Sequence, residues 1–93
     1  MGLIFEWDTV KAKSNLVKHG ITLEESTTVF SDHNSLTIDD PDHSQYEKRN
    51  ITMGLSINNY LLVVVHTERG GRIRIISARL ASRKERKQYE KEI

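Results

Sequence analysis

The chain has 93 residues, a formal net charge of +1 and no cysteine. This length predicts a single domain, residues 1–93, with a small core. The absence of cysteine excludes a disulfide framework, a thiolate nucleophile and a zinc–thiolate site. No apolar run is long enough to span a membrane, and the N-terminus lacks the features of a signal peptide, so we expect a cytoplasmic protein.

Charge is divided unevenly along the sequence. Residues 1–44 carry three lysines against eight carboxylates, a net charge of −5. Residues 45–93 carry eleven lysines and arginines against five carboxylates, a net charge of +6. The basic half predicts a cationic surface that attracts polyanions, of which nucleic acid is the commonest, unless the two halves interleave in space and neutralise each other.

The N-terminal segment predicts a strand at residues 3–7 and a helix over residues 9–19. Asp8 is a good N-cap, and Gly20 occupies the position that ends a helix. Lys18 and His19 lie in the last turn, where cations stabilise the helix dipole. They also have a functional interpretation, as the border of a phosphate site. The apolar stripe expected to pack this helix consists of Val10, Ala12, Leu16 and Val17.

A second helix and two strands are expected next. Thr22 and Glu25 have the spacing of a capping box, which predicts a helix reaching about Phe30. The two helices form a hairpin that can cover one face of a sheet. Residues 35–39 and 49–56 read as strands.

A polar loop of acids and histidine separates these two strands. It contains Asp39, Asp40, Asp42 and His43, which invite a metal-hydrolase hypothesis. Their spacing matches neither a calcium loop nor a zinc motif, so a solvated loop is the favoured interpretation.

The sequence between Tyr60 and Arg79 predicts the hairpin around which the domain is built. Residues 60–65 form an unbroken apolar run, typical of a central strand that is covered on both faces. Gly70-Gly71 supplies the positive φ angles of a tight turn. In the second strand, alternation fails at Ile76, which indicates either burial of both faces or a β-bulge.

The chain should end in a polar helix. Ser82 and Glu85 form another capping box, and the helix is expected from Arg83 to about Glu92. Tyr89 is its main apolar residue, so the helix can dock only lightly. The predicted fold class is α+β: an N-terminal strand, a helical hairpin packed on a four-stranded antiparallel meander, and a C-terminal helix.

Several separated motifs resemble the BrnT family over nearly the whole chain. They are Phe5-Glu-Trp-Asp8, Asn15-x-x-Lys-His-Gly20, Asp40-Pro-Asp-His43, Thr67-Glu-Arg-Gly70, Arg74-Ile-Ile-Ser-Ala-Arg79 and Glu85-Arg-x-x-Tyr89. The resemblance implies a RelE-like toxin of a type II toxin–antitoxin system. It further implies a ribonuclease that needs no metal or other cofactor and inhibits translation. The implied partner is a BrnA-like ribbon-helix-helix antitoxin in a heterotetramer, which alone contacts DNA.

Metal-free cleavage of RNA needs a base for the 2′-hydroxyl, an acid for the leaving oxygen and cations for the phosphate. Arginine suits the last role because its planar fork matches two phosphate oxygens. The residues we expect to be catalytic are Arg74, Arg79, His66 and Glu68. Those we expect to bind RNA are Arg49, Arg72, Lys18, His19 and Tyr89.

Each assignment has a structural alternative. Arg79 can simply pair with Glu85, His66 can be a buried histidine with a hydrogen-bond partner, and Tyr89 can anchor the last helix. The functional alternative is a non-catalytic module whose arginines contact only the phosphates of RNA or a partner.

Overall fold

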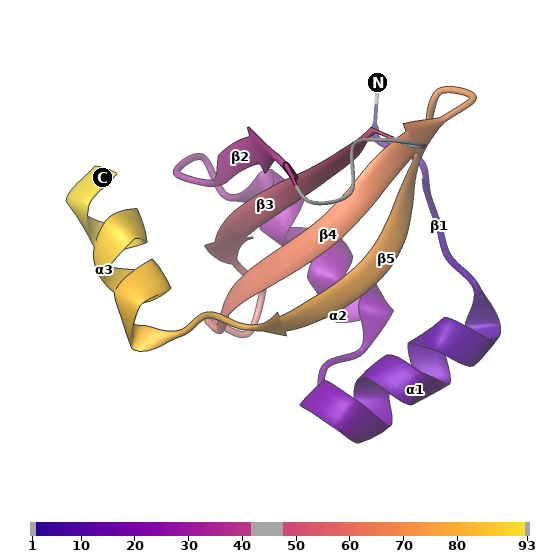
Figure 1. Cartoon of the computed structure of the whole chain (residues 1–93), viewed down its shortest axis with the longest axis horizontal. Coiled ribbons are helices and arrows are strands. Elements are labelled where there is room, and N and C mark those ends of the chain that lie inside the picture. Colours follow the sequence, from indigo (N-terminus) through magenta and orange to yellow (C-terminus); the bar gives the residue numbers. More distant parts are fainter. Residues whose placement is uncertain (1, 42–47, 93) are drawn as a thin grey trace.

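The computed structural model describes residues 2–41 and 48–92. Its strands form one sheet in the order β1-β5-β4-β3-β2 (Figure 1). The strands are β1 (Phe5–Glu6), β2 (Leu36–Asp39), β3 (Arg49–Leu55), β4 (Leu61–Arg69) and β5 (Arg72–Leu80). The helices are α1 (Thr9–His19), α2 (Leu23–Thr27), the 3₁₀ helix η1 (Thr28–Ser31) and α3 (Arg83–Glu92).

The α+β class is confirmed, but the four-stranded antiparallel sheet needs correction. β2 to β5 pair antiparallel, whereas β1 adds to the edge of β5 in parallel, with Phe5 opposite Ile73 and Glu6 opposite Arg74. The sheet is therefore mixed and five-stranded. A strand of two residues carries too little alternation for the sequence to indicate which strand it pairs with. In the structure, β1 covers part of the outer edge of β5, which would otherwise be open.

The central hairpin matches the prediction. β4 lies in the middle of the sheet and is buried on both faces: Leu62 and Val64 face one cluster, and Leu61 and Val63 face another. Gly70 and Gly71 have φ angles of 60° and 78° in the turn to β5, as a two-residue hairpin requires.

A bulge in β5 decides which way its arginines point. Val65 pairs with Ser77 and His66 with Ile75, so Ile76 is the extra residue. Residues five positions apart face opposite sides of a regular strand. The bulge shifts this phase, and Arg74 and Arg79 therefore lie on the same face.

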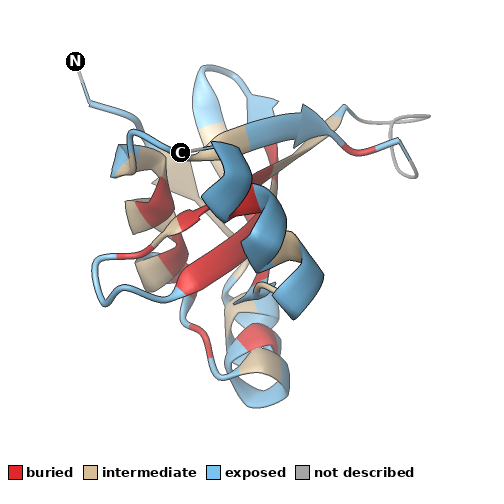
Figure 2. Cartoon of the chain, turned by 90° about the vertical axis from the view of Figure 1, so that its left-hand side faces the viewer, coloured by how far each residue is buried: buried red, intermediate tan, exposed pale blue. Residues whose placement is uncertain are grey.

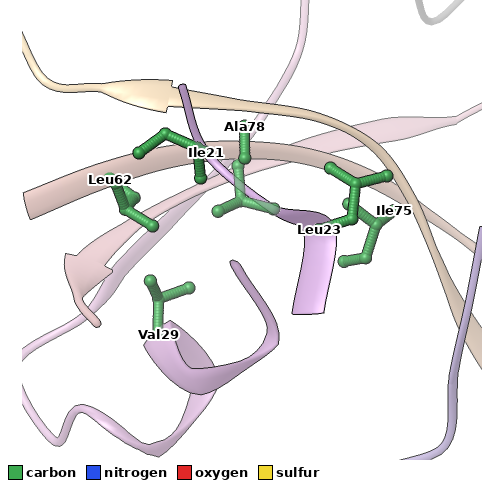
Figure 3. Packing of buried hydrophobic residues seen from close by; sticks show 7 residues of the cluster. Ile21, Leu23, Val29, Leu62, Ile75 and Ala78 are labelled. Carbon is green, nitrogen blue, oxygen red and sulfur yellow. The ribbon is translucent and has the colours of Figure 1, made fainter. Parts of the chain in front are cut away.

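α1, α2 and η1 cover the other face of the sheet. Ile21, Leu23 and Val29 pack on Leu62, Val64, Ile75 and Ala78 (Figure 3). The second helix ends earlier than predicted and continues as η1, because hydroxyls within it bond back to its own carbonyls. The Oγ1 atoms of Thr27 and Thr28 donate to the carbonyls of Glu24 and Glu25, each at 2.7 Å.

The predicted packing of α1 holds for Ala12, which contacts the core, but was wrong for the rest of the apolar stripe. Val10 is 73% exposed and Val17 88%, and the buried residue of the helix is Asn15. The Asn15 amide nitrogen donates to the carbonyls of Ala78 at 2.8 Å and Ile21 at 2.9 Å, and its oxygen accepts from the Ala78 N–H at 3.0 Å. The side chain thus takes the place of a neighbouring strand at the edge of β5, next to the bulge.

Replacing Asn15 by alanine should lower the free energy of unfolding by about 3 kcal/mol, because three buried backbone groups lose their partner. Urea denaturation would measure this loss. Asn58→Ala, at an exposed turn position, is the matched control and should change stability by less than about 0.5 kcal/mol. Equal stability of both variants would contradict this role for Asn15.

α3 lies over one end of the sheet face opposite α1 and α2 and is mostly exposed (Figure 2). Tyr89 packs with Met53, Leu61 and Val63, and its hydroxyl donates to Asp32 Oδ2 at 2.5 Å. The predicted light docking through Tyr89 is confirmed. Within residues 2–41 and 48–92, no helix has the length and apolar character needed to cross a membrane.

Candidate active site

Four residues on four strands form a line across the open face of the sheet, which we call the arginine row. Arg49 on β3 pairs with Thr67 on β4, Thr67 pairs with Arg74 on β5, and Arg74 pairs with Glu6 on β1. Paired residues point to the same face, and neighbouring strands lie about 4.8 Å apart. The row therefore brings two arginines and a carboxylate from distant parts of the chain onto one surface, which we call the arginine face.

Glu6 holds the guanidinium groups at one end of this row. Its Oε2 accepts from Arg74 Nη1 at 2.9 Å, and its Oε1 lies 3.9 Å from Arg72 Nη1. The side chains of Glu6 and Arg74 are each 27% exposed, so solvent and ligands can reach both. A carboxylate next to guanidinium groups combines a proton acceptor with cations that can bind phosphate.

A basic hollow of about 170 Å³ continues this surface over the edge of β5. Lys11, Lys18 and His19 of α1 line it, together with Ser77 from the arginine face. The hollow lies beside the bulge, beyond the end of the short β1 strand. The structure therefore places the predicted Lys18 and His19 next to the arginine face.

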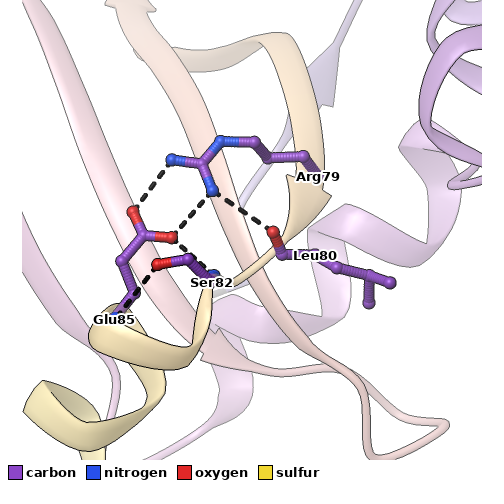
Figure 4. Close-up of polar contacts among 4 residues, drawn as sticks. All are labelled: Arg79, Leu80, Ser82 and Glu85. Atoms are coloured by element: carbon purple, nitrogen blue, oxygen red, sulfur yellow. Dashed lines mark hydrogen bonds and ion pairs between the residues drawn. The ribbon is translucent and has the colours of Figure 1, made fainter.

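Arg79 is engaged elsewhere. Its Nη1 and Nη2 donate to Glu85 Oε1 and Oε2, both at 2.8 Å, and Nη1 also reaches the Leu80 carbonyl at 3.2 Å (Figure 4). Ser82 and Glu85 complete the capping box at the start of α3. Arg79 is paired with Val63, four positions along β4 from Thr67, the partner of Arg74, which is roughly 13 Å along the strand. In this structure Arg79 is therefore directed towards α3 and not towards Arg74.

The Arg79–Glu85 pair should make stability depend on pH. Hydrogen bonds from Arg79 lower the pKa of Glu85 from 4.5 to about 2. A lowered folded-state pKa adds stability above pH 4.5, which is lost as the pH falls towards 2. Glu85→Gln should cost of the order of 1 kcal/mol at pH 7, since both side chains are partly exposed.

Thermal unfolding of wild type and Glu85→Gln at several pH values would check this expectation. The difference between them should shrink steadily from pH 5 to pH 2. Glu90→Gln, an exposed position on the same helix, serves as the control and should show no such trend. A difference that is constant with pH would contradict the role of the pair.

His66 and Glu68 do not join the arginine row. His66 pairs with Ile75 and lies on the face covered by the helices, where its Nε2 is 2.7 Å from Thr52 Oγ1 and its ring contacts Phe30. Burial lowers the pKa of His66. Glu68 faces the same way and is exposed near the turn. Alternation along β4 puts both on the opposite side from Arg74.

Tyr89 is buried as the anchor of α3, so it does not present a ring to solvent. Burial, together with the hydrogen bond to Asp32, raises the pKa of Tyr89 to about 12. The hydroxyl therefore stays protonated near neutral pH. This arrangement corresponds to the structural alternative stated for Tyr89 from the sequence.

In the described ranges, no three His, Asp or Glu side chains are grouped so as to hold a metal ion. Asp42 and His43, part of the metal-hydrolase hypothesis, lie outside the described residues.

Comparison with known proteins decides the family. Residues 7–85 match the family "Ribonuclease toxin, BrnT, of type II toxin-antitoxin system". The chain belongs to the BrnT family. No curated protein matches it. Among solved structures it is similar to the Brucella abortus ribonuclease toxin BrnT, with a TM-score of 0.65 and 21% identity, covering 88% of this chain and 100% of that one.

Membership of the BrnT family makes this chain a ribonuclease toxin with an RNA substrate and an antitoxin partner. For such an enzyme, the relevant chemistry is the binding and activation of a phosphodiester. Among the described residues, the arginine row offers groups suited to this chemistry. The partly exposed carboxylate of Glu6 contacts the guanidinium group of Arg74, and Arg49 lies on the same face two strands away.

The sequence interpretation missed Glu6. Its alternation with Phe5 and Trp7 indicates that Glu6 points away from the core, but pairing with Arg74 is a contact across 68 positions. The family motif Phe5-Glu-Trp-Asp8 was the feature that could have singled it out.

Proposed function

We propose that this BrnT-family toxin, with a RelE-like fold, is a metal-independent endoribonuclease whose active centre is the arginine row. The observation that carries the proposal is the pair of Glu6 and Arg74, 2.9 Å apart, in register with Arg49. Arg74 binds the scissile phosphate, Arg49 and Arg72 add positive charge beside it, and Glu6 acts as the general base.

In the proposed reaction, Glu6 takes the proton of the RNA 2′-hydroxyl. The 2′-oxygen then attacks the adjacent phosphorus, and the bond from phosphorus to the 5′-oxygen breaks. The products are a 2′,3′-cyclic phosphate and a 5′-hydroxyl, whose proton comes from water. Arg74 stabilises the extra negative charge on the phosphorus oxygens. DNA lacks the 2′-hydroxyl, so it is not cut.

The remaining predicted residues fit binding rather than catalysis. Lys18 and His19 can contact a neighbouring phosphate, since they line the basic hollow at the edge of β5 together with Ser77. Arg79 can bind a phosphate further along the strand once Glu85 releases it. We assign no catalytic part to His66 or Glu68, because both lie on the other face of the sheet.

In the cell we propose that the toxin acts in the cytoplasm and inhibits translation by cutting RNA. A BrnA-like ribbon-helix-helix antitoxin would neutralise it in a heterotetramer and would supply the only contacts to DNA. Family membership supports this part of the proposal.

Cleavage of a labelled RNA by the purified wild-type toxin, in excess chelator, tests the proposal. We expect cutting, with 2′,3′-cyclic phosphate at the new 3′ ends and no cutting of the matching DNA. Cleavage that requires added Mg²⁺ or Zn²⁺, or that leaves 3′-hydroxyl ends, would overturn it.

A non-catalytic RNA-binding module is the second candidate. The observation that favours it is the lack of a histidine among the described residues of the arginine row, where it could act as acid or base. His66 itself lies on the other face of the sheet. RNA binding without cleavage, on free RNA and on ribosomes, would support this alternative.

A further inference from the structure

We infer that the groove between α3 and β2 binds an extended segment of the antitoxin, which pairs with the outer edge of β2. The identity of the partner rests on the proposed function. The place and chemistry of the site rest on the groove, the strand edge and the charges described below.

The groove has a volume of about 430 Å³ and an aliphatic floor. Ile51, Met53 and Val63 form it from the central strands, and Leu36 and Ile38 from β2. Ile38 is 61% exposed and extends this floor to the sheet edge, so the groove presents a contiguous apolar surface, which is typical of an interaction site. Glu85, Gln88 and Glu92 of α3 form the opposite wall.

The backbone of β2 offers hydrogen bonds along this groove. β2 is the last strand in the sheet order. The Asp40 N–H donates to the Arg49 carbonyl at 2.8 Å, so the alternate residues Ile38 and Leu36 also direct their backbone groups towards β3. Thr37 and Asp39 therefore direct theirs to the outer edge. An added strand would use these groups for affinity and the aliphatic floor for specificity.

The charge of the groove distinguishes a protein segment from RNA. Arg79 and Glu85 neutralise each other in their bidentate pair, while Glu92 adds a carboxylate to the lining. While Glu85 holds Arg79, the lining of this aliphatic groove has an excess of negative charge, which repels a polyanion. It fits an extended segment with apolar residues at alternate positions and a lysine or arginine opposite Glu92.

Occupation of this groove would also affect RNA binding by the toxin, because Arg79 lines the groove. A bound segment would cover the Arg79–Glu85 pair and hold α3 against the sheet. RNA would then lose the phosphate site that Arg79 provides, without any antitoxin contact to the arginine row.

Ile38→Asp tests the groove by placing a charge on its apolar floor. Binding of the cognate antitoxin, measured by calorimetry, should weaken at least 100-fold, while RNA affinity and cleavage by the free toxin stay within threefold of wild type. Ile57→Asp is the matched control, since Ile57 is 76% exposed and outside the groove, and it should bind normally. Ile38→Thr, which keeps the β-branch, covers the case in which the aspartate variant does not fold.

Asp39→Pro tests the strand pairing, because proline removes the outward N–H and leaves the bonds to β3 intact. We expect binding to the antitoxin about tenfold weaker than for Asp39→Ala, which keeps that N–H. Normal antitoxin binding by Ile38→Asp, equal binding by the two Asp39 variants, or loss of RNA binding instead of antitoxin binding would each overturn the inference. Failure of the wild type to cut RNA would instead count against the proposed function, since the binding measurements do not depend on cleavage.

Discussion

Arg74→Ala should lower the rate of RNA cleavage at saturating RNA roughly 100- to 1,000-fold, the usual cost of removing one preorganised donor from a transition state. Glu6 fixes the Arg74 guanidinium at 2.9 Å, so the donor is already oriented in the free protein. Single-turnover cleavage of a labelled RNA measures the rate. Arg74→Lys keeps the charge but loses the planar fork, so it should recover only part of the activity.

Two further measurements separate catalysis from binding in this variant. If Arg74 is catalytic, the RNA affinity of Arg74→Ala should change little. If Arg74 only binds phosphate, the affinity should fall, the salt dependence of binding should lose about one unit of slope, and the rate at saturation should be unchanged. Arg83→Ala, an exposed arginine on α3, is the control and should behave as wild type in both assays.

Glu6→Gln should reduce cleavage roughly 100-fold or more, because an amide keeps the shape of the side chain but cannot accept the 2′-hydroxyl proton. RNA binding should be retained or slightly tighter, since one negative charge has left the arginine face. Cleavage rates measured across pH with wild type and variant give the decisive comparison. The rise in rate on the acidic side, which a general base produces, should be lost in the variant.

This pH profile also distinguishes a base from a residue that only positions Arg74. Were Glu6 merely holding Arg74, glutamine would still accept its hydrogen bond, and the acidic rise would survive in Glu6→Gln. Glu24→Gln, at an exposed position on α2, controls for loss of one carboxylate and should leave the profile unchanged.

The sequence by itself determined those features that depend on neighbours within a few residues. Asp8 accepts from the N–H groups of Val10 and Lys11, Gly20 has a φ of 72°, and Ser82 and Glu85 form their capping box as predicted. The Gly70-Gly71 turn belongs to the same class. Helix and turn ends are local chemistry, so sequence patterns report them well.

The sequence pattern also predicted that the central strand is buried and that the alternation of the next strand breaks at Ile76. The pattern left open whether that break meant a bulge or coverage of both faces, because both interpretations give the same apolar residues. Only pairing with β4 showed the bulge, and with it the common face of Arg74 and Arg79.

The tertiary structure alone decided the candidate site. Glu6 meets Arg74, and Asn15 bonds to Ala78, only because α1 and β1 both lie at the edge of β5. Apolar residues of α1 therefore stay exposed although their spacing suggested a packed face. His66 and Arg79 are likewise separated from the arginine row, by strand alternation and by the ion pair with Glu85. Contacts between residues more than 60 positions apart depend on which elements pack against the edge of β5. Local sequence patterns contain no information about that packing.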